Sequence, residues 1–310
     1  MSQRRACEVL GQARSTQRYQ PAEPDGEKAL VKRMKELSAQ HPRYGYRRVW
    51  ALLRAEKFEV NKKRVHRLWR REGLKVPRRQ RKRRRLGHSD NSCTRRRAEH
   101  PDHVWSYDFV MDETSDGRRL KLLPVVDEFT RECLAIEMER RLTAADVVAT
   151  LRYLFELRGP PRFVRSDNGP EFVAEAVKAW LKNSGCGTLY IEPGSPWENA
   201  YVESFNGRLE DELLNREEFA TVREAKVLVE DHRLQYNHRR PHSALGYMTP
   251  AAFAASYRAE QRKEKRKKQK EQKECREYTA CGQGLSPPED TNALKDVVFC
   301  GGARISRKLS

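Results

Sequence analysis

The chain has 310 residues, enough for one large domain or two to three smaller ones. Lysine and arginine outnumber aspartate and glutamate by 63 to 44, so the formal charge is +19 and a polyanionic partner is favoured, most commonly nucleic acid. No apolar run approaches the roughly 18 residues of a membrane-spanning helix, and the N-terminus lacks the apolar segment of a secretory signal. We therefore expect a cytoplasmic protein with no membrane partner.

The seven cysteines are irregularly spaced and include no C-x-x-C pair. This pattern argues against a zinc ribbon and is typical of reduced thiols.

The first 74 residues are predicted to be helical. Residues 1–26 form a polar segment that can hold two short helices, with Ser15 as a possible cap of the second. Residues 27–74 show three helical patterns, of which the third is expected to begin at an Asn61 cap and to stop at Gly73.

The third helix carries a basic outer face. Its outward positions are Lys62, Lys63, His66, Arg67, Arg70 and Arg71. A short basic helix that follows another across a tight turn is the outline of a helix-turn-helix reader of DNA. The alternative is a solvated basic face on an ordinary helical subdomain.

Residues 75–103 are expected to form a basic linker. KVPRRQRKRRR holds eight Lys or Arg among eleven residues, and a block this dense repels itself and does not pack alone. We expect Arg78, Arg79 and Arg81 to contact a phosphate backbone, which is compatible with a role as a flexible tether.

Residues 104–258 are predicted to form an α/β domain with a mixed sheet. Three strands joined by short turns are followed by helix, strand, helix, strand and helix. Ser195 to Glu198 match a capping box that opens the last of these helices. Residues 259–310 form a basic low-complexity tail, expected as a charged helix or a disordered segment, with no function assigned.

Three acidic residues in separate segments are the candidate catalytic groups. Asp108 interrupts an apolar strand pattern, where a carboxylate is costly unless it is paired, hydrogen-bonded or bound to metal. The alternative for Asp108 is an exposed position on an alternating face. Asp167 ends a strand in Asp-Asn-Gly, which is also a common turn. However, the strand leads directly into a helix, where α/β folds place sites.

Glu203 falls on the helix after the capping box, with 35 residues between it and Asp167. Asn199, Asn206 and Glu210 share its face, so we expect a polar face toward the sheet, with a surface ion-pair helix as the alternative. Three carboxylates suit Mg²⁺ or Mn²⁺ better than zinc, and a pair of such ions drives in-line displacement at phosphorus.

Several longer strings together resemble a known family. They are RRACEVLGQARSTQRYQP, HPRYGYRRVWALL, WSYDFV, VVDEFTRE, SDNGPEF, PGSPWENAYVESFNGRLEDELLN and YNHRRPHSALGYMTPAAF. Their order resembles a B-frame transposase of the bacterial insertion-sequence-three family, among the retroviral-integrase-like recombinases. The resemblance covers about residues 1 to 255.

The resemblance implies a ribonuclease-H-like catalytic core preceded by a small helix-turn-helix domain. It implies that Asp108, Asp167 and Glu203 are the catalytic triad, using two Mg²⁺ ions for strand cleavage and transfer. It also implies element ends and target DNA as substrates, an A-frame partner or fusion, a homo-oligomer on DNA, and a nucleoid location. Two alternatives remain: a nuclease of the same fold, and a DNA-binding remnant without activity.

Overall fold

We describe the fold from a computed structural model, which describes residues 2–19, 26–76, 97–166, 175–190 and 199–281. The chain divides into two compact units, Met1–Tyr257 and Arg258–Ser310.

The N-terminal segment holds two short helices, as expected. Helix α1 spans Gln3–Val9 and is capped by Ser2, whose hydroxyl accepts from the Arg5 backbone N–H. Helix α2 spans Arg14–Arg18. The predicted cap at Ser15 is wrong, because Ser15 lies inside α2 and the cap position is Ala13, which has no side-chain oxygen.

Three helices then pack around an apolar core of their own. They are α3 (Glu27–Gln40), α4 (Tyr46–Ala55) and α5 (Lys62–Arg71). Met34, Val49 and Leu68 are fully buried in this core. The Asn61 side chain accepts from the Lys63 backbone N–H at 3.0 Å, which confirms the predicted cap of α5.

The second part of the unit is built on one mixed sheet. Its strands are β1 (Val104–Tyr107), β2 (Val110–Glu113), β3 (Arg119–Asp127), β4 (Cys133–Glu139), β5 (Phe163–Ser166) and β6 (Gly187–Tyr190). The order is β2-β3-β1-β5-β6, and β4 pairs with the other edge of β3. The pairs among β1 to β4 are antiparallel, whereas β1–β5 and β5–β6 are parallel.

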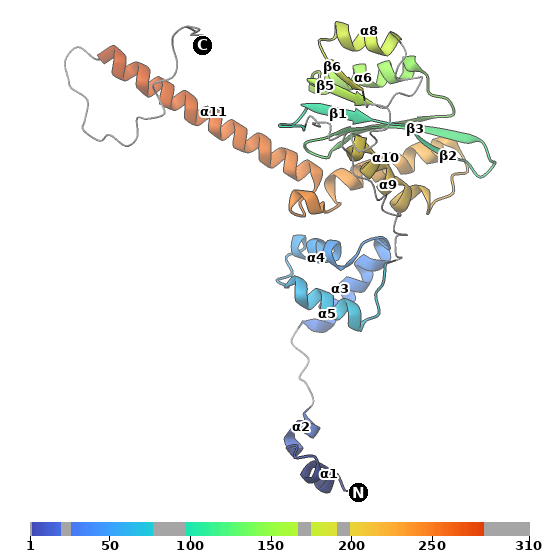
Figure 1. Cartoon of the computed structure of the whole chain (residues 1–310), viewed down its shortest axis with the longest axis vertical. Coiled ribbons are helices and arrows are strands. Elements are labelled where there is room, and N and C mark those ends of the chain that lie inside the picture. Colours follow the sequence, from blue (N-terminus) through green and yellow to red (C-terminus); the bar gives the residue numbers. More distant parts are fainter. Residues whose placement is uncertain (1, 20–25, 77–96, 167–174, 191–198, 282–310) are drawn as a thin grey trace, which may run out of the picture. The chain divides into compact units, whose positions relative to one another are not determined.

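Helices cover both faces of the sheet (Figure 1). Helices α6 (Ala144–Arg158) and α8 (Glu175–Asn183) pack on one face, around a core that includes Trp105, Leu151 and Val177. The opposite face is covered by α9 (Ala200–Leu209), the π-helical turn η2 (Glu210–Leu214) and α10 (Val222–His238). The predicted capping box at residues 195–198 lies outside the described residues.

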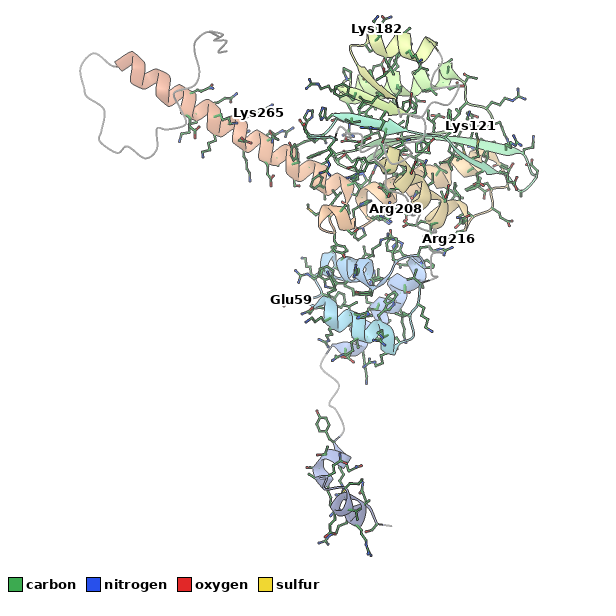
Figure 2. All side chains as sticks on the ribbon, in the orientation of Figure 1. Glu59, Lys121, Lys182, Arg208, Arg216 and Lys265 are labelled. Carbon is green, nitrogen blue, oxygen red and sulfur yellow. The ribbon has the colours of Figure 1, made fainter. Side chains whose placement is uncertain are left out.

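The chain continues through the short helix η3 (Ser243–Leu245) into α11 (Pro250–Cys281). The tail is therefore a charged helix as far as Cys281, and Figure 2 shows charged side chains along it, Lys265 among them. None of the described helices is long and apolar enough to cross a membrane.

Candidate active site

Asp108 lies at a break in the sheet, between the end of β1 and the start of β2. The pairings of β1 and β2 with β3 continue one register, in which Asp108 falls opposite Pro124. Because proline has no N–H to donate to the ladder, the strand pairing with β3 is interrupted at residues 108 and 109, between β1 and β2. Asp108 shares its sheet face with Ser106 and Val110, and this face is the one that α9 covers.

The half-buried Asp108 carboxylate accepts hydrogen bonds from the backbone and from α9. The Phe109 backbone N–H donates to Oδ1 at 2.8 Å, and Asn206 Nδ2 donates to Oδ2 at 3.1 Å. Asn206 is 7% exposed and belongs to α9. The Asn206–Asp108 hydrogen bond thus ties the helix that carries Glu203 to the strand break that carries Asp108.

Glu203 lies in the first turn of α9 and is exposed. The buried stripe of this helix consists of Val202, Phe205 and Leu209, with Asn206 beside it. The expectation of a wholly polar face toward the sheet is therefore wrong. The apolar stripe fixes α9 on the sheet, while Glu203 stays accessible to solvent and to a ligand.

Asp167 lies outside the described residues. The strand that leads to it, β5, ends at Ser166 and runs parallel to β1, with Arg165 in register with Ser106. The carboxyl ends of neighbouring parallel strands meet at one edge of a sheet, which is where open α/β sheets bind ligands.

The oxygen atoms around Asp108 suit a hard cation. Among the described residues, the Oδ1 atoms of Asn199 and Asn206 are buried and have no hydrogen-bond partner. Amide and carboxylate oxygens are the ligands that Mg²⁺ and Mn²⁺ prefer, and α9 with its cap residue supplies such oxygens from Asn199, Glu203 and Asn206. The described residues hold no group of three Asp, Glu, His or Cys that could bind a metal, and Asp167 is not among them.

A buried ion pair that sequence reasoning missed lies beside β5. Arg165 Nε donates to Glu128 Oε1 at 2.9 Å, and the two side chains are 4% and 0% exposed. Arg165 lies at the end of β5 and Glu128 follows the end of β3, so the pair ties these two strand ends together. Asp167 comes two residues after Arg165 in the sequence. Charged residues inside the apolar strings VVDEFT and FVRSD were the signal that could have indicated it.

The predicted DNA-binding residues of α5 have different surroundings. Lys63, His66, Arg67 and Arg70 are exposed, and the His66 ring lies 4.3 Å from that of Tyr46. Arg67 is also 3.8 Å from the buried carboxylate of Glu27, which Arg71 approaches at 2.5 Å. This carboxylate and its arginines tie α5 to the start of α3.

Lys62 differs from the other basic residues of α5. It is half-buried, with Nζ 4.8 Å from the centre of the Trp50 ring and 5.2 Å from that of Tyr247. The expectation that it points outward is therefore wrong. The linker residues Arg78, Arg79 and Arg81 lie outside the described part of the chain.

Comparison with known families matches both parts of the first unit. Family models described as an integrase core domain match residues 98–196 and 184–250, and a model described as an HTH-like domain matches residues 25–83.

Relatives that cover 72% to 84% of this chain include proteins of insertion elements. The uncharacterized 39.2 kDa protein of IS476 from Xanthomonas euvesicatoria is 42% identical over 84% of this chain and 75% of its own length. The uncharacterized 31.7 kDa protein of IS407 from Burkholderia multivorans is 43% identical over 84% and 92%. The transposase for IS904 from Lactococcus lactis is 27% identical over 72% and 92%.

A solved structure of the HTLV-2 integrase catalytic core domain is 17% identical, with a TM-score of 0.41 over 51% of this chain and 99% of that one. The family matches and the mixed sheet confirm the expected ribonuclease-H-like core, preceded by a helix-turn-helix-like domain. The chain belongs to the integrase-core transposases of bacterial insertion elements.

Proposed function

We propose that Asp108, Asp167 and Glu203 are the catalytic and metal-binding triad of this transposase, which cleaves element ends and joins them to target DNA. The hydrogen bond between Asn206 and Asp108 carries the proposal, because it places the helix of Glu203 against the strand break of Asp108. The parallel pairing of β1 with β5 supports the third position, Asp167.

The side chains divide the work of the site. The Asp108 carboxylate is held in a fixed orientation by hydrogen bonds from Asn206 and from the Phe109 N–H. Glu203 lies in the exposed first turn of α9, one turn before Asn206, and in the sequence Asp167 follows directly after the adjacent strand β5. Two bound Mg²⁺ or Mn²⁺ ions would supply an activated water or DNA 3′-hydroxyl and stabilise the departing 3′-oxygen.

The DNA would be held mainly through its phosphates. Lys63, His66, Arg67 and Arg70 present donors on the exposed face of α5. The basic linker with Arg78, Arg79 and Arg81 extends this positive surface in sequence. We further propose that the protein works at the nucleoid as a multimer bridging two element ends, with an A-frame partner or fusion.

A cleavage and joining assay with labelled element ends and Mg²⁺ tests this function. The wild-type protein should produce both nicked ends and strand-transfer products. Cleavage without joined product would instead indicate a nuclease of the same fold. If Glu203→Gln left every measurable function intact, the protein would be a DNA-binding remnant.

A further inference from the structure

We propose that a cluster centred on Glu212 clamps the helix-turn-helix-like domain to the catalytic core and positions it for productive joining. The proposal rests on the transposase function above and adds a role for residues outside the triad. We call Arg48, Glu212 and Arg240, with the ring of Tyr44, the junction cluster.

Glu212 is the carboxylate that connects the two domains. Its two oxygens accept from Arg240, with Nε at 2.8 Å and Nη2 at 2.6 Å, in the two-pronged geometry that makes arginine–carboxylate pairs strong. Arg48 of α4 donates to the same carboxylate at 3.1 Å. Arg240 is 2% exposed and the Glu212 side chain 9%, so the interaction is shielded from water and salt.

The aromatic ring of Tyr44 completes the cluster. It is 7% exposed, and the guanidinium carbons of Arg48 and Arg240 lie 5.0 and 6.0 Å from its centre. Beside it, Arg43 Nε lies 3.6 Å from Asp211. Arg43 and Tyr44, in the turn before α4, and Arg48, within α4, thus all lie beside the turn η2 or Arg240.

The buried Arg240–Glu212 pair sets the charge balance of the cluster, and the partly exposed Arg48 side chain adds a second cation to it. Burial by itself raises the pKa of Glu212, but the hydrogen bond and charge of Arg240 outweigh it and hold that pKa below its usual value. Burial and the nearby Arg240 lower the pKa of Arg48. Removing Arg240 or Glu212 would leave the other charge buried and uncompensated, whereas removing Arg48 breaks the contact between the domains and leaves the Arg240–Glu212 pair intact.

An aromatic contact joins the same two domains at a second point. The rings of Trp50 and Tyr247 lie 5.6 Å apart, edge to face, with Lys62 Nζ near both. Tyr247 has a φ of 69°, a left-handed conformation that non-glycine residues adopt at a cost and that surrounding contacts must hold.

The cluster is placed where it can influence catalysis. Turn η2 begins at the residue after α9 ends, so Glu212 belongs to the same continuous helical segment as Glu203 and Asn206. The three segments that meet here contain HPRYGYRRVW, RLEDELLN and YNHRRPHSALGY, whose charged and aromatic residues the metal chemistry does not use. A shift of the helix-turn-helix-like domain would therefore act on the helix that carries the catalytic glutamate.

Arg48→Met tests the clamp, with Arg47→Met as its matched control. Arg47 is the exposed neighbour of Arg48 on α4 and loses the same charge, but it does not touch Glu212. In scanning calorimetry we expect the wild-type domains to unfold together. In Arg48→Met we expect a separate, earlier transition of the helix-turn-helix-like domain, whereas Arg47→Met should unfold like wild type.

Joining assays give the functional readout. Arg48→Met should bind end DNA like Arg47→Met but join it about tenfold more slowly, as a coupling of ordinary size would produce. Adding Glu212→Gln to Arg48→Met should cost less than the two single changes together, because both break one interaction.

Identical unfolding and joining of Arg48→Met and Arg47→Met would overturn the clamp, as would strict additivity with Glu212→Gln. A wild-type protein that joins no DNA would refute the transposition chemistry instead, while the calorimetric comparison would still decide on the clamp.

Discussion

Asn206 is the residue that turns two distant carboxylates into parts of one site. It is buried on α9, donates to Asp108, and stands three residues after Glu203. An amide at this position can orient a metal-ligating carboxylate by a hydrogen bond without adding charge. Residues that hydrogen-bond to metal ligands commonly orient them in this way.

Replacing Asn206 with Leu should keep the packing of α9 but release Asp108. We expect Mg²⁺-dependent joining to fall by about 10 to 100-fold, the usual cost of losing such a supporting contact, and the Mg²⁺ concentration for half-maximal rate to rise. Glu210→Gln, an exposed change at the end of the same helix, serves as the control. An unchanged metal requirement in Asn206→Leu would remove Asn206 from the site.

Asp127 makes folding stability depend on pH. Burial raises its pKa from 3.8 to about 6, although Thr130 and the Phe129 N–H donate to it. The folded protein therefore binds this proton more tightly than the unfolded chain. The cost of burying the charge is fully present above about pH 6 and disappears as the pH falls below 4.

Asp127→Asn should remove this cost. We compare the free energy of unfolding of the variant with that of wild type, measured by urea unfolding at pH 8 and at pH 4. This difference should favour the variant more at pH 8 than at pH 4, by on the order of 2 kcal/mol. Asp116→Asn should show the opposite sign, because hydrogen bonds from Arg118 lower the pKa of Asp116 and its contribution is lost as the pH falls. A pH-independent difference for Asp127→Asn would contradict the account.

At the scale of elements, α5 depends on its cap. Asn61→Ala should destabilise the helix-turn-helix-like domain by about 1 kcal/mol, because the Lys63 N–H loses its acceptor. Asn61→Asp keeps an acceptor and should retain most of the stability. Thermal unfolding of both variants checks this, and equal losses in the two would show that the cap is not the cause.

Elements with strong local signals were predictable from the sequence. The helices of residues 27–74 and the Asn61 cap follow from helical period and capping chemistry. The prediction that Ser15 caps α2 was wrong because the helix begins two residues earlier than expected, after Ala13. The segment is short and polar, so no apolar period in the sequence indicates where the helix starts.

Features that depend on distant parts of the chain were not predictable. The break at Asp108 follows from pairing with Pro124. The partial burial of Lys62 follows from its contact with the Trp50 and Tyr247 rings. Likewise, Arg48 and Glu212 are 164 positions apart. No local pattern carries such contacts, because tertiary packing chooses the partner.

For the whole molecule, the charge of +19 predicts DNA binding that weakens steeply with salt. Changing Arg78, Arg79 and Arg81 together to Gln should reduce the slope of log affinity against log salt by about 3, since each phosphate contact contributes about 0.9. Fluorescence anisotropy at several salt concentrations measures it. An unchanged slope would show that these linker residues do not touch the phosphates.

The central claim is that three acids from separate segments form one metal-dependent transposition site. The most direct measurement is joining of labelled element ends by Asp167→Asn, compared with wild type across a Mg²⁺ titration. We predict end binding like that of wild type and joining reduced by about 1,000-fold, the rate equivalent of several kcal/mol. Joining at the wild-type rate by Asp167→Asn would contradict the account.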